Sequence, residues 1–572
     1  MDGKFIKKSP QYFALIDIRY RGQNYVKMAA FPDTSSFRNG TFLFKNSYSN
    51  IGYALEQFPD AEWEGDALKE LEDYKKFKET ETETVNDKED VTDYGDCLSK
   101  TKPFNHQLKA FNISKDRDEY GLLFEQGCGK TKVIIDNARY LFDRDKIRSL
   151  VVIAPNGVHD NWVDDELPIH MAGDYYAMAW RSSFNKTQRK LWDKIKELKD
   201  TLTIFAFNVE TFTSEKNKQE LLDILNSRDC MLAIDESQKI KTPSAKRTKF
   251  LARTARCFAK YRRILTGTPV TKGAEDFYTQ LMFLNPNILG ITAFSGFKNR
   301  YCVMGGWEGK QIVSYRNIEE LQEKVENYSM RVLKKDCLDL PEKLYQFTPF
   351  DLSKKQMELI DQIKKDGVAE LKGLKSDAMI LEHAMTRITK IQQIANGYLI
   401  ETDNDGKIHE IVPPNKNPRL LKLKETLHQI ESKVVIWTKY RYDVNIISNI
   451  LPKGSFVRYT GAESQDERKE NKKRFMEDIN CDYFLVNLQA GATGLTLTAA
   501  HYNIYYNNSY DLELRLQSED RTHRIGTVNN VIYNDFIANK TPERKIINAL
   551  KKKKSISDLI LKDPAGFFLE EK

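Results

Sequence analysis

The chain lacks the features that mark secreted, membrane-spanning and disulfide-stabilised proteins. Its 572 residues include seven scattered cysteines, with no C-x-x-C pair and no nearby histidine at metal-ligand spacing. No run of about 18 uncharged apolar residues occurs, and the start, MDGKFIKKSPQYF, lacks the apolar core of a secretion signal. We therefore expect reduced thiols and a protein that does not associate with membranes and is cytoplasmic in a bacterial or virus-infected cell, or nuclear in a eukaryote.

A strong excess of one charge is also absent. Lysine and arginine number 89 against 82 acids, which leaves a net charge of +7. This mild basicity is compatible with a nucleic-acid partner but does not indicate one by itself. Hydrophobic residues make up 40% of the chain, which is enough for two or three globular domains.

The first hundred residues differ in composition from the rest. Residues 1–78 contain the strand-like runs YFALIDIRY, YVKMAAF and GTFLFKN followed by the helical ALEQF, and predict a small accessory α+β module. Residues 79–96 hold eight acids, one lysine and almost nothing to bury. We therefore predict a flexible acidic linker over residues 79–100.

Two later regions alternate apolar runs with helical spacing, a pattern typical of parallel α/β sheets. The first region, residues 101–290, contains GLLFE, SLVVIAP, LTIFAF, CMLAID and RRILTG. The second, residues 415–545, contains SKVVIWT, SFVRYTG, YFLVNLQAG, YNIYYNN and NNVIYNDFI. We predict two α/β lobes.

The remaining segments are predicted as mainly helical. Residues 291–414 are expected to form a helical insertion and bridge, because Lys354 to Leu399 is nearly free of glycine and proline. Residues 546–572 are expected to form a basic helix and tail. The lysines at 551–554 either contact phosphates or form a solvated face.

The stretch FEQGCGKT lies between an apolar run and a segment with helical spacing, where a phosphate-binding loop would lie. Gly127, Cys128 and Gly129 would let backbone N–H groups surround phosphate oxygens, while Lys130 would meet the terminal phosphates and Thr131 would bind magnesium. The strict pattern places a glycine where Phe124 stands, so a chance match stays open at this point.

A second motif, CMLAIDESQK, places two carboxylates at the end of an apolar strand, where charge is costly unless it is used. Asp235 would hold the magnesium ion. Glu236 would orient and deprotonate the water that attacks the γ-phosphate.

Two weaker motifs accompany these. The strand RRIL ends in Thr266, Gly267, Thr268 and Pro269, which would couple the nucleotide site to its lobe or form an ordinary turn. In the second lobe, Arg521 and Arg524 would share one face of a helix. They would act as arginine fingers, or belong to a surface salt-bridge face with Glu519 and Asp520.

Together, these motifs resemble the Swi/Snf branch of superfamily 2 helicase-type ATPases, over about residues 102–561, with features of the annealing-helicase subgroup. The family's loop, D-E-M-G-L-G-K-T, begins with an acid, so Phe124 is no objection. QSEDRTHRIGT is similar to Q-A-x-D-R-x-H-R-x-G-Q, and VVIAPNGVHDNW keeps the family's Pro155 and Trp162. Gln238 stands where the family has a histidine, which puts in doubt only how the lobes signal to each other.

The resemblance implies roles for residues that spacing alone did not assign. Gln107 would contact the adenine base. Gln517, Arg521 and Arg524 would approach the nucleotide from the second lobe, and Gly491 to Thr493 would lie near the DNA backbone.

The resemblance further implies two RecA-like lobes, ATP and Mg²⁺ as cofactors, and sequence-independent binding of double-stranded or forked DNA. The expected activity is ATP-driven translocation on duplex DNA that remodels or reanneals DNA structures in repair, replication or recombination. A strand-separating helicase and a slow ATPase that acts as a DNA-binding switch or scaffold are the alternatives. The N-terminal module would read a DNA structure such as a fork, or serve for docking or stability.

Overall fold

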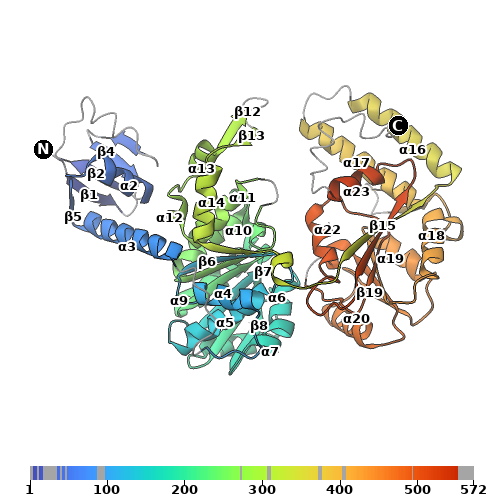
Figure 1. Cartoon of the computed structure of the whole chain (residues 1–572), viewed down its shortest axis with the longest axis horizontal. Helices are drawn as coiled ribbons and strands as arrows, with labels where there is room; N and C mark the ends of the chain where they lie inside the picture. The colour runs from blue at the N-terminus through green and yellow to red at the C-terminus, as the bar shows by residue number, and fades with distance from the viewer. Residues whose placement is uncertain are drawn as a thin grey trace. The chain divides into compact units, whose positions relative to one another are not determined.

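The computed structural model describes residues 4–9, 12–16, 35–38, 41–45, 48–86, 97–270, 273–305, 311–371, 377–401, 407–491 and 494–551. The chain divides into two compact units, residues 1–337 and residues 338–572. Each unit contains a parallel sheet with helices around it (Figure 1). Among the described helices, none combines the length and apolar character that a membrane span requires.

The first unit begins with a small α+β module. Its elements are β1 (Lys4–Ser9), β2 (Tyr12–Ile16), β3 (Ser35–Arg38), β4 (Thr41–Lys45), α2 (Tyr48–Gln57), β5 (Glu62–Glu64) and α3 (Asp66–Asn86). The sheet order is β3-β4-β2-β1-β5, and only the β1–β5 pair is parallel. Phe5, Leu15, Phe44 and Ile51 form its core. The predicted run YVKMAAF lies outside the described residues.

Helix α3 extends into the segment for which the sequence predicted a flexible linker. It ends at Asn86, so residues 79–86 are helical, and residues 87–96 lie outside the described residues. The segment from Asp66 to Asn86 contains neither glycine nor proline, so nothing stops the helix from propagating through the glutamates and threonines.

The first lobe is built on a seven-stranded sheet in which every pair of neighbours is parallel. The strands are β6 (Glu119–Phe124), β7 (Ser149–Ala154), β8 (Tyr175–Ala179), β9 (Leu202–Asn208), β10 (Cys230–Asp235), β11 (Tyr261–Leu265) and β14 (Ser329–Val332). Their order is β14-β6-β11-β10-β7-β9-β8. The parallel sheet predicted from the apolar runs is confirmed.

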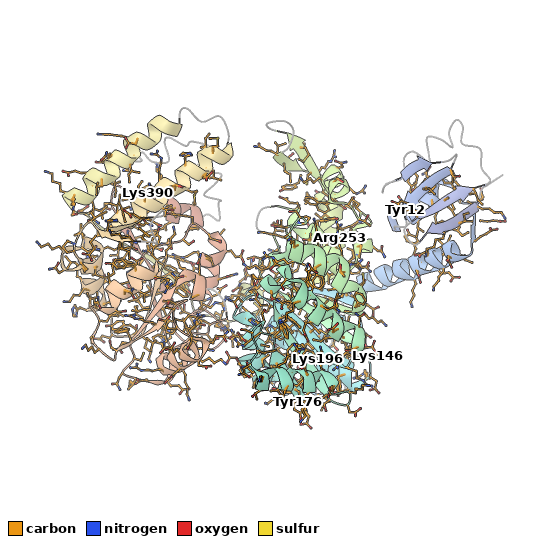
Figure 2. The ribbon with its side chains drawn as sticks, turned by 180° about the vertical axis from the view of Figure 1, so that it is seen from behind. Tyr12, Lys146, Tyr176, Lys196, Arg253 and Lys390 are labelled. Atoms are coloured by element: carbon orange, nitrogen blue, oxygen red, sulfur yellow. The ribbon has the colours of Figure 1, made fainter. Side chains whose placement is uncertain are left out.

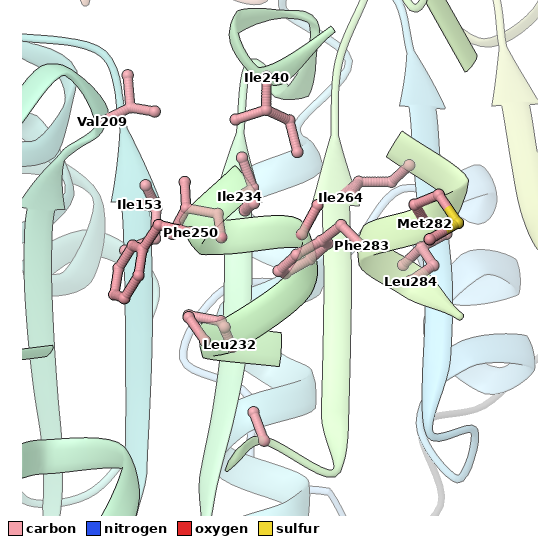
Figure 3. Packing of buried hydrophobic residues seen from close by; sticks show 14 of the residues in the cluster. Ile153, Val209, Leu232, Ile234, Ile240, Phe250, Ile264, Met282, Phe283 and Leu284 are labelled. Atoms are coloured by element: carbon pink, nitrogen blue, oxygen red, sulfur yellow. The ribbon is translucent and has the colours of Figure 1, made fainter. Parts of the chain in front are cut away.

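The inner strands are apolar on both faces because helices cover both faces of the sheet (Figure 1). Ile153, Ile234 and Ile264 project from three neighbouring strands into one layer, where Phe250 and Phe283 pack (Figure 3). β8 is half-buried and lies at the edge; its run YYAMA is apolar, but it is not among the strands predicted from the sequence.

Seventeen described helical segments, α, 3₁₀ and π, belong to this lobe. They are α4 (Asn105–Ser114), α5 (Lys130–Asp143), α6 (Val158–Asn161), η1 (Trp162–Glu166), α7 (Leu167–His170), α8 (Lys186–Glu197), η2 (Val209–Thr213), α9 (Glu215–Ser227), η3 (Ser237–Ile240), α10 (Lys246–Lys249), η4 (Phe250–Thr254), η5 (Ala255–Phe258), α11 (Asp276–Leu284), α12 (Pro286–Leu289), α13 (Phe294–Tyr301), α14 (Ile318–Asn327) and α15 (Lys334–Cys337). Polar contacts tie some of them together: Glu220 on α9 accepts hydrogen bonds from Lys196 (Figure 2) and Trp192 on α8.

The stretch 291–414, predicted as a helical insertion, contains strands as well. β12 (Cys302–Gly305) and β13 (Gln311–Tyr315) pair as an antiparallel hairpin, whereas β14 extends the first sheet and β15 (Lys343–Phe350) extends the second. β14 and β15 are edge strands with largely exposed or half-buried side chains. They lack the continuous apolar pattern of a central strand, and the sequence therefore gave no strand signal.

The second unit repeats the parallel architecture. Its sheet contains β15, β18 (Val434–Thr438), β19 (Phe456–Tyr459), β20 (Tyr483–Asn487), β21 (Tyr502–Tyr505) and β22 (Val531–Ala538), in the order β15-β22-β21-β18-β20-β19. All neighbouring strands are parallel. The prediction of two RecA-like α/β lobes is confirmed.

Some helices of the second unit pack around this sheet, and others form an apolar cluster of their own. They are α16 (Lys354–Leu371), α17 (Asp377–Ala395), η7 (Pro414–Lys416), α18 (Pro418–Leu427), α19 (Arg441–Ser448), α20 (Gln465–Glu477), α21 (Leu488–Gly491), α22 (Leu512–Glu519) and α23 (Glu543–Lys551), with a hairpin of β16 (Tyr398–Ile400) and β17 (Ile408–Glu410). Ile360, Ile388 and Ile546 join α16, α17 and α23 in one apolar cluster. Residues 552–572 of the predicted basic tail lie outside the described residues.

A polar cluster lies where β18 meets α17 and the segment before α22. The carboxamide oxygen of Gln392 accepts hydrogen bonds from Lys439, Tyr440 and Tyr510. The Lys439 ammonium also lies 3.6 Å from the ring centroid of Tyr510. Burial lowers the pKa of Lys439 to about 7, against the opposing charge of Asp443.

We predict that Lys439→Met makes the protein more stable near neutral pH. Between pH 7 and about 10 the unfolded chain holds a proton on this lysine that the folded protein gives up, so wild-type stability rises with pH across this window. Methionine has no charge to bury, so it removes a free-energy cost of folding of roughly 1–3 kcal/mol at pH 7. Urea unfolding at pH 7 and pH 9.5 measures the effect, with exposed Lys424→Met as control. An equal gain at both pH values would contradict the account.

Candidate functional site

Three neighbouring strands of the first lobe bring the predicted nucleotide motifs together. In the sheet, β11 lies between β6 and β10. The phosphate loop follows β6, and the Thr266–Pro269 turn follows β11. Asp235 is the last residue of β10, and Glu236 comes directly after it. Because carboxyl ends of parallel strands meet at one edge, all three motifs share that edge.

The phosphate loop depends on glycine at two positions. Gly127 and Gly129 have φ values of +82° and +74°, in the left-handed region that other residues avoid. A Cβ on Gly129 would also lie 2.0 Å from Nε2 of Gln107. Gly129 is therefore required both by its backbone conformation and by the close approach of a side chain from α4.

The segment Phe104–Gln107 is fastened to this loop. Nε2 of Gln107 donates to the Gly129 carbonyl at 3.1 Å, and its Oε1 accepts from the Phe104 amide at 2.8 Å. Nε2 of His106 lies 2.8 Å from the Cys128 carbonyl oxygen. Burial lowers the pKa of His106, which favours the neutral imidazole. Gln107 thus lies beside the loop, and its contact with an adenine base stays a prediction.

The lysine of the loop is buried in contact with the loop backbone. Nζ of Lys130 donates to the Phe124 carbonyl at 3.0 Å and approaches the Glu125 carbonyl at 3.5 Å. Lys130 begins α5, and Thr131 follows it in the first turn of that helix. Both therefore lie at a helix N-terminus, where backbone N–H groups and the helix dipole favour an anion.

Cys128 is buried within the loop, and its Sγ lies 3.8 Å from Sγ of Cys337. Burial raises the pKa of Cys128 to about 12. The thiol therefore stays protonated at neutral pH, and Cys128 contributes to the loop through its backbone and its packing rather than as a nucleophile.

Asp235 is a buried carboxylate held by a tryptophan. Nε1 of Trp162 donates to its Oδ2 at 3.0 Å, and the Glu236 amide donates to its Oδ1 at 3.0 Å. Burial, followed by the charge of Glu236, raises the pKa of Asp235 to about 6. A cation bound here would offset both causes. The sequence identified Trp162 only as a motif match, because an indole N–H directed at a residue 73 positions away leaves no local signal.

Glu236 has an unusual backbone conformation. Its φ of +52° makes it one of four non-glycine residues in the left-handed region among the described residues. Its carboxylate accepts from two glutamine amides: Nε2 of Gln126 lies 3.1 Å from Oε1, and Nε2 of Gln238 lies 2.9 Å from Oε2. The sequence analysis had no reason to single out Gln126.

Gln238, which stands where the family has a histidine, connects Glu236 to the turn after β11. Its Oε1 accepts from the Thr266 hydroxyl at 2.6 Å, and that hydroxyl accepts from the Thr268 amide at 3.0 Å. Glutamine can serve here because its amide both donates to the carboxylate and accepts from the hydroxyl. A continuous set of hydrogen bonds thus links this turn to Glu236, and the coupling of the turn to a nucleotide stays a prediction.

The donor set fits magnesium held mainly by a nucleotide. Among the described residues, no group of three or more His, Cys, Asp or Glu side chains could form a metal site of its own. Mg²⁺ commonly binds one carboxylate together with phosphate oxygens and waters. Asp235 and the Thr131 hydroxyl would hold such an ion, which would shield phosphate charge.

The predicted residues of the second lobe lie around the end of α22. Gln517 is on the helix, and Arg521 and Arg524 both donate to the Leu495 carbonyl, at 3.4 and 3.2 Å. The prediction that both arginines lie on a helix is wrong, because α22 ends at Glu519. The Arg521 carbonyl accepts from the Leu497 amide instead of continuing the helical pattern. The two side chains meet through a shared acceptor.

The acids of the proposed salt-bridge face have other cationic partners. Glu519 is buried and contacts Arg515 and Lys343, and Asp520 also contacts Lys343. Gly491 ends α21, where a Cβ would lie 2.2 Å from Cγ2 of Val486. Residues 492 and 493, predicted with Gly491 to lie near DNA, are outside the described residues.

Comparisons with known proteins agree with this arrangement of motifs. The model of the SNF2-related domain matches residues 105–398, and that of the helicase conserved C-terminal domain matches residues 416–526. The first model alone covers about half of the chain.

Two of the relatives that match this chain are a bacterial helicase/translocase and a yeast transcription regulator. A putative ATP-dependent helicase/translocase, YwqA of Bacillus subtilis, is 27% identical over 357 residues, which is 61% of this chain and 37% of that protein. The transcription regulatory protein SNF2 of Saccharomyces cerevisiae is 25% identical over 78% of this chain and 26% of its own length. The chain thus spans well under half the length of both.

Among solved structures, the Sulfolobus solfataricus SWI2/SNF2 ATPase core in complex with dsDNA matches with 22% identity and a TM-score of 0.37. The match covers 85% of this chain and all of that one. The SNF2-related model over half of the chain, followed by the helicase C-terminal model, shows that this chain belongs to the SNF2 family of helicase-type ATPases.

Proposed function

We propose that this protein hydrolyses ATP to drive translocation along double-stranded DNA, and that it remodels or reanneals DNA structures. The observation that carries the proposal is the meeting of Lys130, Asp235 and Glu236 at one sheet edge. These are the cation, metal ligand and base that phosphoanhydride hydrolysis requires.

Each residue of the first lobe has a specific task in this proposal. Lys130 and the N-terminus of α5 bind the β- and γ-phosphates. Asp235 and Thr131 hold Mg²⁺. Glu236 orients the attacking water and accepts its proton. The adenine base stacks near Phe104, a residue that is 43% exposed beside the buried Gln107.

The second lobe supplies positive charge for the transition state. In the proposal, Arg521 and Arg524 approach the γ-phosphate while Gln517 supports them. Both arginines already share the Leu495 carbonyl, so they would move as one group. DNA binding through phosphates makes each step independent of sequence, and repair, replication or recombination is the proposed setting.

ATP hydrolysis should rise strongly with duplex or forked DNA and remain low without DNA. Steady-state assays with no DNA, single-stranded, duplex and forked DNA measure this, and Glu236→Gln, expected to lose about 10²- to 10⁴-fold in turnover, is the blank. Stimulation by single strands alone would replace the proposal with a strand-separating helicase. Slow turnover on every DNA would favour the DNA-binding switch.

Lys130→Ala should lower ATP turnover by about 100-fold or more, because it removes a preorganised cation at the phosphates. ATPase assays and binding of a fluorescent ATP analogue measure the two effects. Exposed Lys146→Ala, near the C-terminal end of α5 (Figure 2), is the matched control. Wild-type turnover in the Lys130 variant would exclude the loop as the nucleotide site.

Arg521→Ala should bind ATP normally but lose about 10³-fold or more in turnover, as expected for an arginine finger. Single-turnover hydrolysis beside analogue binding separates the two steps, and Arg544→Ala on the exposed face of α23 is the control. Normal turnover in the Arg521 variant would remove this residue from the proposed role.

A further inference from the structure

The two hydrogen bonds on Glu236 come from different parts of the first lobe. Gln126 belongs to the phosphate loop, whereas Gln238 belongs to η3 and continues to the Thr266 hydroxyl. The carboxylate of the proposed base is therefore attached at Oε1 to the loop and at Oε2 to the turn after β11.

The position of Gln126 is fixed by packing as well as by this bond. A Cβ on Gly267 would lie 3.1 Å from Cγ of Gln126 and 3.1 Å from its backbone nitrogen. Gly267 follows Thr266 in the turn, so the turn packs directly on Gln126. The loop, the turn and the acid thus meet around one glutamine side chain.

The same loop arrangement also occupies the lysine. Lys130 donates to the carbonyls of Phe124 and Glu125, the two residues before Gln126. To bind phosphates, its ammonium must exchange these carbonyls for phosphate oxygens. The exchange breaks the hydrogen bonds that hold the carbonyls of the two residues before Gln126. Phosphate binding at Lys130 is therefore coupled to the contact between Gln126 and Glu236.

We propose that Gln126 is a positioning residue that holds Glu236 in a resting orientation until ATP occupies the loop. The inference rests on the proposed ATPase function and adds its regulation. In the resting arrangement the Gln126 amide donates to Oε1 of Glu236. The attacking water must displace this amide before Glu236 can accept its proton. When the ATP phosphates bind Lys130, Gln126 releases Oε1 of Glu236. The Glu236 carboxylate then keeps its hydrogen bond to Gln238, which is bonded to the turn after β11.

The sequence pattern supports a role particular to this chain. The family loop quoted above, D-E-M-G-L-G-K-T, has methionine at the position of Gln126. Methionine has a similar length but no N–H to donate. Gln126→Met therefore removes the hydrogen bond while keeping the side chain's volume against Gly267.

The test is ATP hydrolysis by the full chain with and without saturating duplex DNA. Gln126→Met should lower the KM for ATP by about 10-fold, because ATP binding no longer has to break a hydrogen bond to a charged group. The kcat should stay within about twofold of wild type with and without DNA, because bound ATP has already released Glu236 in the wild type. Gln126→Leu also lacks a donor and keeps most of the side chain's volume, so it should act in the same direction.

Gln219→Met is the matched control, because Gln219 donates to the Asp223 carboxylate at 2.7 Å on α9 in the same way. The unfolding midpoint by circular dichroism verifies that each variant folds. An unchanged or raised KM for ATP in both Gln126 variants would overturn the inference while leaving a DNA-stimulated wild type intact. A wild type without DNA-stimulated hydrolysis would instead overturn the proposed function.

Discussion

The parallel register of the first sheet is the constraint on which the site depends. β6, β11 and β10 are neighbours, so the segments that follow them emerge side by side. A series of hydrogen bonds therefore runs from Gln126 through Glu236 and Gln238 to Thr266. No single helix or hairpin could gather these groups, because their distances along the chain exceed any local motif.

The site also stores strain that its hydrogen bonds hold in place. A non-glycine residue in the left-handed region costs about 1–3 kcal/mol, and Glu236 is such a residue. Its amide is bound to Asp235, and its two carboxylate oxygens are bound to Gln126 and Gln238. A conformation this costly persists because several partners determine it, and a change in any of them would reorient the carboxylate.

The sequence predicted the central strands of both sheets but only one of the four edge strands, β19. β7 and β10 are apolar runs because they are buried on both faces, whereas β14 and β15 are edge strands with mixed patterns and β8 is an apolar run of only five residues. Spacing and resemblance selected Lys130, Asp235 and Glu236, but their partners Gln126 and Trp162 come from pairings that only the folded sheet creates. The helix expected at Arg521 ends earlier also because of a long-range pairing. The Leu497 amide donates to the Arg521 carbonyl, which the sequence could not show.

The central claim is that hydrolysis moves the protein along duplex DNA. Displacement of a fluorescent triplex-forming strand from a duplex measures such movement directly, because the third strand leaves only when a motor passes beneath it. The account predicts ATP-dependent displacement that Glu236→Gln abolishes and that requires duplex on the approach side. DNA-stimulated ATP hydrolysis without displacement would contradict it.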